Sequence, residues 1–412
     1  MRILFLLTQD LESPLGIGRV WPLARELVGR GHQVRIAALH SNWAGLTERR
    51  FIKNGVMVEY VAPMHVRKIG SQKQYYSPFK LAAVVLRASW ALARAALSAP
   101  VDIIQVCKPH PMNSLAGLLA YRLKGGVLCV DCDDYEAAVN RFGAGWQQRV
   151  VAFFERHVPR AAQVVTTHTD FMHDKLVAWG CPAERIHYLS NGVDLERFTP
   201  PSPPTVSALR EKLGLQHKQV VAYLGSLSLT SHPIDLLVEA FKILNEQLPK
   251  TALLLVGGGE DAERLGDLAQ HLGIGQDVYF TGRVVPAELP LYYALADVTV
   301  DPVYDNEAAR GRSPLKMFES WASGVPFITA PVGERVKLAG NPPASLLVSP
   351  PGDRVALAKG IQSILESPIL AQQLRQQGLE RVKKFTWDLL AEQIEAVYQE
   401  AVLAQYDRKH HL

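Results

Sequence analysis

The chain has 412 residues, of which 48% are hydrophobic and 20% charged, and its formal net charge is +4. Because a single hydrophobic core stops growing at about 250–300 residues, this length predicts two domains. No run of about 18 apolar residues is free of charge, which excludes a membrane-spanning helix, and the 4 cysteines are too few for a disulfide framework, which favours a reduced cytoplasmic protein.

The first half of the chain alternates short apolar runs with segments of helical periodicity. The opening run, residues 3–7, stops at Thr8-Gln9-Asp10 without a cleavage pattern, so it predicts a buried strand and not a signal peptide. Further strands are predicted at residues 33–38, 103–106, 127–130 and 164–166. This alternation is typical of parallel strands joined by crossover helices.

The same rhythm restarts in the second half, with strands predicted at residues 220–224, 252–256, 278–280, 298–300 and 327–329. The fold class predicted is therefore α/β, with two tandem doubly wound, Rossmann-like domains and a cleft between them. We expect a first domain over residues 1–198, a Pro-rich linker over 199–206 and a second domain over 207–386. An amphipathic helix from about 387 to 412 should pack back on the first domain.

Charge is distributed unevenly between the two halves. Residues 1–198 hold 24 Lys and Arg against 16 Asp and Glu, whereas residues 199–412 hold 20 against 24. Residues 61–101 contain no acid at all, but they contain several basic and aromatic residues: Arg67, Lys68, Lys73, Tyr75, Tyr76, Phe79, Lys80, Arg87, Trp90 and Arg94. This stretch predicts contact with an anionic membrane surface, although its helical part, 78–98, could equally be a core helix. Nothing in the chain resembles a base-reading element, so no nucleic-acid partner is expected.

Glycines follow several of the predicted strands. Gly16 and Gly18 lie between the first strand and a helix, where backbone N–H groups can approach a phosphate, but a tight turn explains them as well. Residues 257–259 are three glycines at the end of another strand, and both a turn and a close ligand approach fit them.

The segment from Arg310 to Pro326 is the most informative part of the chain. Ser313 can cap a helix that begins at Pro314 and ends before Gly324. Arg310, Arg312 and Lys316 surround that helix N-terminus, which favours a pyrophosphate site. Lys316 and Glu319 are three residues apart and so share one face, where one can meet a phosphate and the other a ribose diol. A salt-bridged helix without a ligand is the alternative.

The order of these motifs resembles the retaining GT-B glycosyltransferases of family 4, also called glycosyl transferases group 1. The resemblance extends over nearly the whole chain and is carried by the first glycine loop, Asn191-Gly192-Val193-Asp194 with Phe198, Gly225, and the segment from Ser313-Pro314-Leu315-Lys316 through Glu319 to Gly324-Val325-Pro326. It implies a donor nucleotide held mainly by the second domain and an acceptor held mainly by the first.

The resemblance also implies roles for single residues. Glu319 would bind the ribose, Gly16 and Gly18 would face the donor phosphates or sugar, and Arg283 with Val284 would lie near the base. The remaining residues expected to bind the donor are Gly225, Ser226, His232, Arg310, Arg312, Ser313, Pro314, Leu315 and Lys316. For Asn191 and Asp194 a turn is favoured over contact with substrate.

The sequence departs from the family pattern at three positions. Gly311 stands where the first of two glutamates is usual, Ser226 where an Arg is usual, and Ser231 or His232 where a Lys is usual. Lys316 with Arg310 or Arg312 must therefore replace the usual pyrophosphate clamp if the protein is an active enzyme.

A second group of polar residues follows two strands of the first domain. Residues 131–134 read Asp-Cys-Asp-Asp, a D-x-D pattern that another glycosyltransferase fold uses to hold a metal, but the tandem layout argues against that fold and no metal is expected. Asp133 and Asp134 are candidates for catalysis, and Asp133, Lys108 and His110 are candidates for contact with the acceptor. The alternative for the two aspartates is that they cap a helix, and the alternative for His110 is a purely structural role.

The sequence thus predicts a retaining glycosyltransferase that uses a nucleotide sugar, UDP- or GDP-linked, and no other cofactor. Its acceptor would be a sugar or a lipid-linked sugar of cell-envelope polysaccharide synthesis, reached from the cytoplasmic face of the membrane. Two alternatives remain. One is a sugar-nucleotide 2-epimerase, and the other is a scaffold that binds a nucleotide sugar without turnover, which is favoured by the absence of the usual Glu at Gly311 and of the usual Arg at Ser226.

Overall fold

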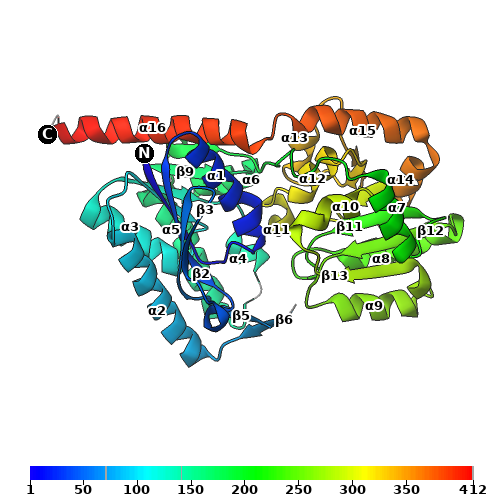
Figure 1. Cartoon of the computed structure of the whole chain (residues 1–412), viewed down its shortest axis with the longest axis horizontal. Coiled ribbons are helices and arrows are strands. Elements are labelled where there is room, and N and C mark those ends of the chain that lie inside the picture. Colours follow the sequence, from blue (N-terminus) through cyan, green and yellow to red (C-terminus); the bar gives the residue numbers. More distant parts are fainter. Residues whose placement is uncertain (70–71, 141, 411–412) are drawn as a thin grey trace. The chain divides into compact units, whose positions relative to one another are not determined.

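The computed structural model describes residues 1–69, 72–140 and 142–410, and it divides into two compact units (Figure 1). Unit 1 consists of Met1–Gly192 together with Trp387–Leu412, and unit 2 of Val193–Thr386. The units join at 192–193 and 386–387, whereas the sequence predicted a linker at 199–206. That segment is partly helical, because Ser202 caps a helix whose first turn accepts the two prolines that follow it.

Unit 1 is built on an eight-stranded sheet with the strand order β10-β9-β8-β7-β1-β2-β4-β3, in which only the edge strand β3 is antiparallel to its neighbour. Its strands are β1 (Arg2–Leu7), β2 (Gln33–His40), β3 (Arg50–Lys53), β4 (Val56–Pro63), β7 (Ile103–Cys107), β8 (Val127–Asp131), β9 (Val164–Thr167) and β10 (Ile186–Tyr188). A separate hairpin is formed by β5 (Val66–Ile69) and β6 (Gln72–Tyr75).

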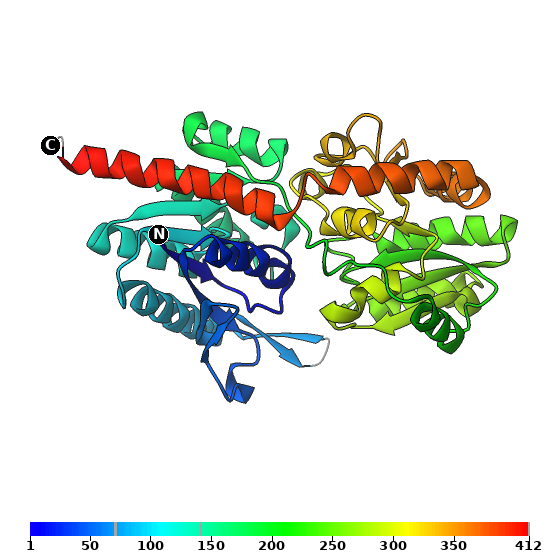
Figure 2. The ribbon, with the colours of Figure 1, turned by 45° about the horizontal axis from the view of Figure 1, so that its top comes forward.

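Helices cover both faces of this sheet. One face carries α1 (Trp21–Gly29) and α16 (Trp387–His410), which lie side by side (Figure 2). The other face carries α2 (Pro78–Leu97), α3 (Pro111–Lys124), α5 (Gly145–Ala161) and α6 (Asp170–Ala178). A short helix, α4 (Glu136–Val139), follows β8.

Unit 2 repeats the plan with a six-stranded parallel sheet of order β13-β12-β11-β14-β15-β16. The strands are β11 (Gln219–Leu224), β12 (Thr251–Val256), β13 (Val278–Gly282), β14 (Val298–Val300), β15 (Phe327–Thr329) and β16 (Leu346–Leu347). The helices are α7 (Pro203–Lys212), α8 (Ile234–Gln247), α9 (Ala262–His271), α10 (Leu289–Tyr293), α11 (Glu307–Arg310), α12 (Leu315–Ala322), α13 (Arg335–Ala339), α14 (Arg354–Glu366) and α15 (Pro368–Val382).

The predicted fold class, two α/β units with Rossmann-like parallel sheets, is confirmed. Every predicted strand exists and lies within two residues of its predicted bounds, because continuous apolar runs are typical of strands that are buried on both faces. None of the described helices is long and apolar enough to cross a lipid bilayer.

The C-terminal helix α16 completes the core of unit 1. Its apolar face contributes Trp387, Leu390, Ile394 and Tyr398, each of which is buried. The hydroxyl of Tyr398 donates a hydrogen bond of 2.8 Å to the Oε1 atom of Gln105, a polar side chain in the middle of β7.

We predict that Tyr398→Phe lowers the free energy of unfolding by about 1–3 kcal/mol, since the buried Gln105 oxygen loses its donor. Urea denaturation followed by circular dichroism measures the change. Tyr304→Phe, at a half-exposed ring in unit 2, is the matched control and should leave the urea midpoint unchanged. An equal midpoint for both variants would contradict the stabilising role of this hydrogen bond.

Candidate functional site

The carboxyl end of the unit 1 sheet holds a buried ion pair between Arg19 and Asp131. Arg19 lies in a π-helical turn, Gly16–Val20, and its Nε and Nη2 atoms donate to the two carboxylate oxygens of Asp131 at 2.8 and 2.9 Å. Its Nη1 atom donates to Asn191 at 3.0 Å. Burial alone would raise the pKa of Asp131, but the Arg19 charge and hydrogen bonds lower it, so both groups are ionised.

This ion pair fixes the first glycine loop. Gly16 is required there by packing, because a Cβ atom on it would lie 2.4 Å from the carbonyl oxygen of Asp10. Asn191 accepts a hydrogen bond from Arg19, and Asp194 accepts two from the backbone N–H groups of Glu196 and Arg197. Asp194 therefore shapes the turn that follows it, whereas Asn191 anchors the Arg19 side chain.

Lys108, His110, Asp133 and Asp134 come together beside this pair, joined by Glu136. The Lys108 ammonium lies 2.6 Å from Asp134, 2.5 Å from Glu136 and 3.4 Å from Asp133. Lys108 has a φ of 59°, an uncommon conformation for a residue with a Cβ atom, and it turns the side chain into the cluster from the end of β7.

His110 is held at both ring nitrogens. Its Nδ1 atom lies 2.8 Å from the hydroxyl oxygen of Thr8, and its Nε2 atom lies 2.9 Å from Glu136. Burial raises the pKa of Asp133 well above its usual value, and the neighbouring carboxylates raise it further although Lys108 lowers it.

The carboxylates of Asp133, Asp134 and Glu136 lie within 4.8 Å of one another, a spacing that could suit a cation. The Lys108 ammonium lies among these carboxylates and hydrogen-bonds to Asp134 and Glu136, whereas the buried Oδ1 atom of Asp133, 3.4 Å away, accepts no hydrogen bond within the described residues. The cluster therefore has its own internal cation.

In unit 2, Asp301 organises the corresponding sheet edge. It follows β14, and its Oδ1 atom accepts a hydrogen bond of 2.9 Å from the Lys316 ammonium. Its Oδ2 atom accepts two, of 3.0 and 2.7 Å, from Arg335. The three side chains are buried, and the two cations hold the pKa of Asp301 well below its usual value although burial opposes this.

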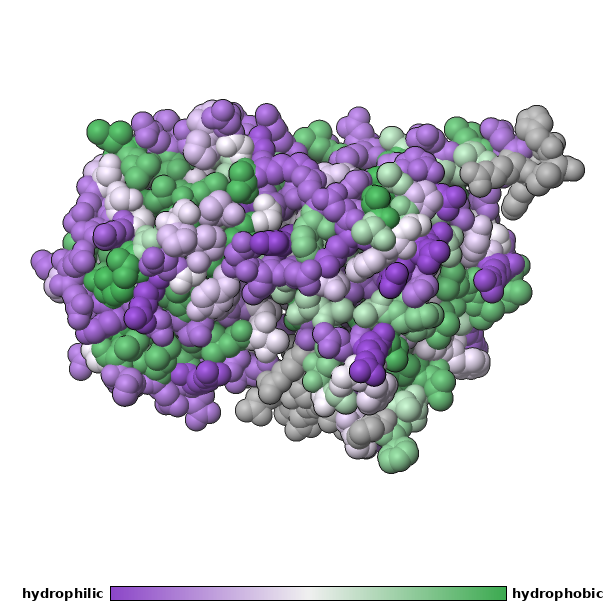
Figure 3. All heavy atoms as spheres, turned by 180° about the vertical axis from the view of Figure 1, so that it is seen from behind, coloured by the Kyte–Doolittle hydropathy of each residue, from purple (hydrophilic) through white to green (hydrophobic). Residues whose placement is uncertain are grey.

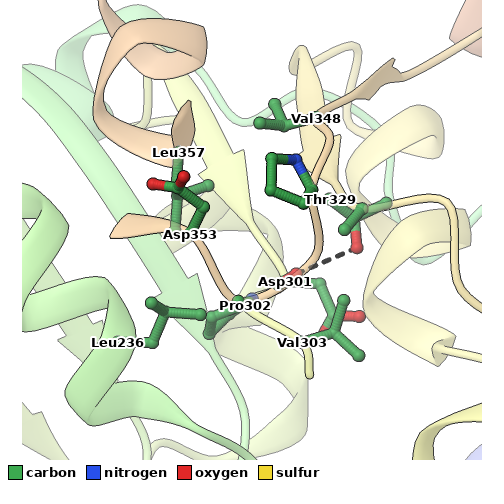
Figure 4. A pocket seen from close by; sticks show the side chains of 11 residues that line it. Leu236, Asp301, Pro302, Val303, Thr329, Val348, Asp353 and Leu357 are labelled. Atoms are coloured by element: carbon green, nitrogen blue, oxygen red, sulfur yellow. Dashed lines mark hydrogen bonds between the residues drawn. The ribbon is translucent and has the colours of Figure 1, made fainter. Parts of the chain in front are cut away.

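A small pocket lies beside Asp301 and is lined by residues from the ends of neighbouring strands (Figure 4). The hydroxyl of Thr329, at the end of β15, donates a hydrogen bond of 2.9 Å to the backbone oxygen of Asp301. Most of the other lining side chains are apolar, including Leu236, Val303 and Leu357. The pocket therefore offers no cationic side chain to a diphosphate.

Lys316 lies in a mixed aromatic and cationic environment. Its ammonium is 4.3 Å from the ring centre of Tyr223, a favourable cation–π geometry. Burial, with the nearby charges of Arg312 and Arg335, lowers the pKa of Lys316 to about 8 although Asp301 raises it. The ammonium form therefore predominates at neutral pH.

Arg312 and His232 complete this group. The Nη1 atom of Arg312 donates a hydrogen bond to the backbone oxygen of Ser231, which brings this cation beside residues 231 and 232. His232 is 2.9 Å from the Ser231 hydroxyl oxygen and packs edge-on against Tyr223. Burial and the Arg312 charge lower the pKa of His232 well below its usual value, so its ring is neutral.

Glu319 lies one turn along α12 from Lys316. Its Oε2 atom accepts a hydrogen bond of 2.9 Å from the hydroxyl of Tyr293. Burial raises the pKa of Glu319, and the Arg197 charge opposes the shift. One carboxylate oxygen is thus oriented by Tyr293.

Other predicted donor residues fall outside this group. Arg310 is half-exposed and forms a bidentate pair with Asp305, at 2.6 and 2.9 Å, so it is not available as a clamp in this conformation. Ser313 and Pro314 are buried, but α12 begins at Leu315 and no side chain caps it, so the predicted Ser313 cap is wrong. Arg283 is exposed and Val284 half-buried, both after β13.

The glycines at the end of β12 serve close packing between loops. A Cβ atom on Gly257 would lie 1.9 Å from the carbonyl oxygen of Gly225, and one on Gly259 would lie 2.1 Å from that of Leu227. Gly225 itself and Ser226 are exposed, and the Ser226 carbonyl accepts a hydrogen bond from Tyr223 at 3.0 Å. Close packing between the loops is thus enough to require glycine at 257 and 259.

Sequence reasoning missed Asp301, Arg335, Arg19 and Glu136. The only signal for Asp301 was a lone acid at the end of an apolar strand, a place where ligands and their supporting groups gather in such sheets.

We predict that Asp301→Asn lowers the free energy of unfolding by about 3–5 kcal/mol, because it leaves two buried cations without their counter-charge. Asp305→Asn removes the partner of Arg310 at an exposed pair and is the matched control, with an expected loss of about 0–1 kcal/mol. Urea denaturation of both variants measures the contrast. Equal small losses would show that Lys316 and Arg335 do not depend on Asp301.

Comparison with known proteins finds related domains in both units. The family described as Glycosyl transferases group 1 matches residues 206–381, and the family described as Glycosyl transferase 4-like domain matches residues 16–192. A GDP-mannose-dependent alpha-(1-6)-phosphatidylinositol monomannoside mannosyltransferase of Mycobacterium tuberculosis is 31% identical over 260 residues, which is 62% of this chain and 66% of that protein. The chain spans between 52% and 66% of the length of the first curated relatives that it matches.

Solved structures with the same architecture cover the whole fold. A sucrose-phosphate synthase from Thermosynechococcus elongatus has a TM-score of 0.76 at 22% identity, over 98% of this chain and 100% of that one. The HepE protein of Anabaena in complex with UDP and glucose has a TM-score of 0.73 at 18% identity, over 97% and 100%. The two halves of the chain thus each match a glycosyltransferase domain, and the chain shares the two-domain GT-B architecture of these solved structures.

Proposed function

We propose that the protein transfers a sugar from a nucleoside-diphosphate sugar to an acceptor, with retention of the anomeric configuration. The observation that carries this proposal is the group formed by Lys316, Arg312 and Glu319 at the carboxyl edge of the unit 2 sheet. It offers cations to a diphosphate and a buried carboxylate to a ribose diol, which together match the polar parts of such a donor.

The proposed chemistry is electrostatic. Breaking the bond between the anomeric carbon and the diphosphate builds negative charge on the departing oxygens, and the ammonium of Lys316 stabilises that charge. Arg312, lying against Ser231, supplies the second cation in place of the residues that the family has at Ser226 and Ser231 or His232. A donor phosphate oxygen takes the acceptor proton, a route that requires no side-chain nucleophile and agrees with retention.

We assign the acceptor to the polar cluster of unit 1. Asp133, and Asp134, which is partly exposed, can form hydrogen bonds with a hydroxyl of the acceptor. Lys108 holds these carboxylates in place, and His110 is oriented by Thr8 and Glu136. Because the Lys108 ammonium already lies among these carboxylates, where a cation would bind, we propose that the reaction needs no metal at this cluster.

Relatives suggest the class of donor and acceptor. A UDP- or GDP-linked donor is proposed because one relative is named as GDP-mannose-dependent and one structural neighbour was solved with UDP and glucose. A lipid-linked or free sugar acceptor of cell-envelope synthesis is proposed because the mannosyltransferase relative is named for a phosphatidylinositol monomannoside. We expect the protein to work on the cytoplasmic side of the membrane.

Thermal unfolding in the presence of UDP, GDP, ADP, TDP and their sugar conjugates tests the donor site, since a ligand that binds only the folded state raises Tm. We expect one nucleotide family to raise Tm clearly. Turnover of that donor only with an acceptor supports transfer, and conversion of the donor alone would identify the 2-epimerase alternative. Binding without turnover over a broad acceptor panel would instead support the scaffold.

We predict that Lys316→Ala and Glu319→Ala each reduce transfer at least ~10²-fold. Lys316→Ala removes a contact to the diphosphate that strengthens as charge develops, and Glu319→Ala removes the contact that positions the ribose of the donor. Arg310→Ala, whose side chain pairs with Asp305, is the control and should stay within a few-fold of the parent. Initial rates with the donor identified above give the comparison. Near-normal turnover in either of the first two variants would remove that residue from the site.

A further inference from the structure

Three neighbouring helices of unit 1 expose apolar residues on the side away from the sheet. α2, α3 and α5 all pack against the same face of the sheet, through residues such as Ala88, Leu92, Met112, Ala116 and Val158. α3 contacts both α2 and α5. Their outward sides therefore form one continuous surface, which we call the outer helical face.

On α2 the exposed apolar residues follow helical spacing. Phe79, Leu86 and Trp90 are 92%, 72% and 64% exposed, and they stand at positions i, i+7 and i+11. In Figure 3, hydrophobic side chains gather along the lower right margin of the view, where α2 lies. Three such large side chains on one exposed stripe are far more than the isolated apolar residues that ordinary surfaces carry.

The other two helices extend this stripe. On α5, Trp146, Val150 and Phe153 are exposed at positions i, i+4 and i+7. On α3, the exposed residues are Leu115, Leu119 and Leu123. None of these residues was singled out from the sequence, because each helix read separately has the apolar content of a core helix.

The charges on the outer helical face are of one sign. Its exposed basic residues are Lys80, Arg87, Arg94, Arg122, Lys124, Arg149, Arg156 and Arg160. The only acid in the three helices is Glu155, which is buried on the inner side of α5. Within the part of the chain that the structure describes, none of these eight cations forms an ion pair, whereas Arg50, Arg310 and Arg354, also exposed, each pair with an acid.

We propose that the outer helical face docks on the anionic surface of a lipid bilayer. Aromatic and aliphatic side chains would enter the region between headgroups and acyl chains, and the unpaired Lys and Arg side chains would meet lipid phosphates. A partner protein of ordinary composition would supply carboxylates at fixed positions, but the cations here are spread along three helices without a fixed pattern of partners, which suits a fluid anionic layer.

This proposal includes part of the stretch that the sequence indicated, residues 61–101, and adds α3 and α5 to it. The side chains of Arg67, Lys68, Lys73 and Tyr75 lie outside the described residues. The surface does not depend on the proposed transfer reaction, since membrane binding can be measured without donor or acceptor.

Co-sedimentation of the full chain with vesicles tests the proposal. We expect binding to vesicles of phosphatidylcholine with phosphatidylglycerol at low salt, and at least ~10-fold weaker partition to phosphatidylcholine alone or at high salt, where surface charge is screened. The apolar variant Phe79→Ser/Trp90→Ser/Phe153→Ser and the charge variant Arg87→Gln/Arg149→Gln/Arg156→Gln should each bind anionic vesicles at least ~10-fold more weakly.

Matched control variants carry the same kinds of change on exposed residues of unit 2. They are Ile369→Ser/Val355→Ser/Val336→Ser and Lys250→Gln/Lys359→Gln/Lys384→Gln, and both should bind as the parent does. Thermal unfolding of every variant checks the fold. Failure of the parent to bind, loss of binding in the controls to the same extent, or a dimer in sedimentation equilibrium that the apolar variant dissociates would each overturn the proposal; the last would show that a second copy covers this face.

Discussion

A carboxylate buried at the end of a central strand is the constraint on which both sheet edges depend. An ionised carboxylate away from water requires cations in hydrogen-bonding contact, and each unit draws them from distant parts of the chain. Asp131 takes Arg19 from the first glycine loop, and Asp301 takes Lys316 from α12 and Arg335 from α13. These contacts decide where the loops at each edge lie, and with them the polar groups that face a substrate.

The parts of the fold that could be predicted are those with local causes. Strands buried on both faces must be apolar along their whole length, so the continuous apolar runs of β7 and β12 were sufficient to predict these strands. The edge strands β3 and β10 and the hairpin of β5 and β6 were not predicted, because their residues mix polar and apolar types as their partial exposure allows. Pro203 wrongly suggested a linker without helix, because the first turn of a helix tolerates proline.

The candidate site was predictable in composition but not in pairing. Sequence spacing brought Lys316 and Glu319 to one helix face, and strand ends brought Lys108 near residues 133–134. The pairs that set their charge states join residues far apart in sequence, such as Asp301 with Arg335, and only the folded chain shows them. Gly257 is a further example: glycine is required there because a Cβ atom would collide with the carbonyl oxygen of Gly225, and not because of the residues next to it in the sequence.

The placement of α16 has a consequence for biosynthesis. The core of unit 1 is closed on one face by Trp387, Leu390 and Tyr398, which the ribosome makes only after all of unit 2. During translation the first unit therefore waits with apolar residues of β1 and α1 uncovered, while unit 2, which is continuous in sequence, can fold as soon as it has emerged. The domain that is synthesised first is thus the one that finishes folding last.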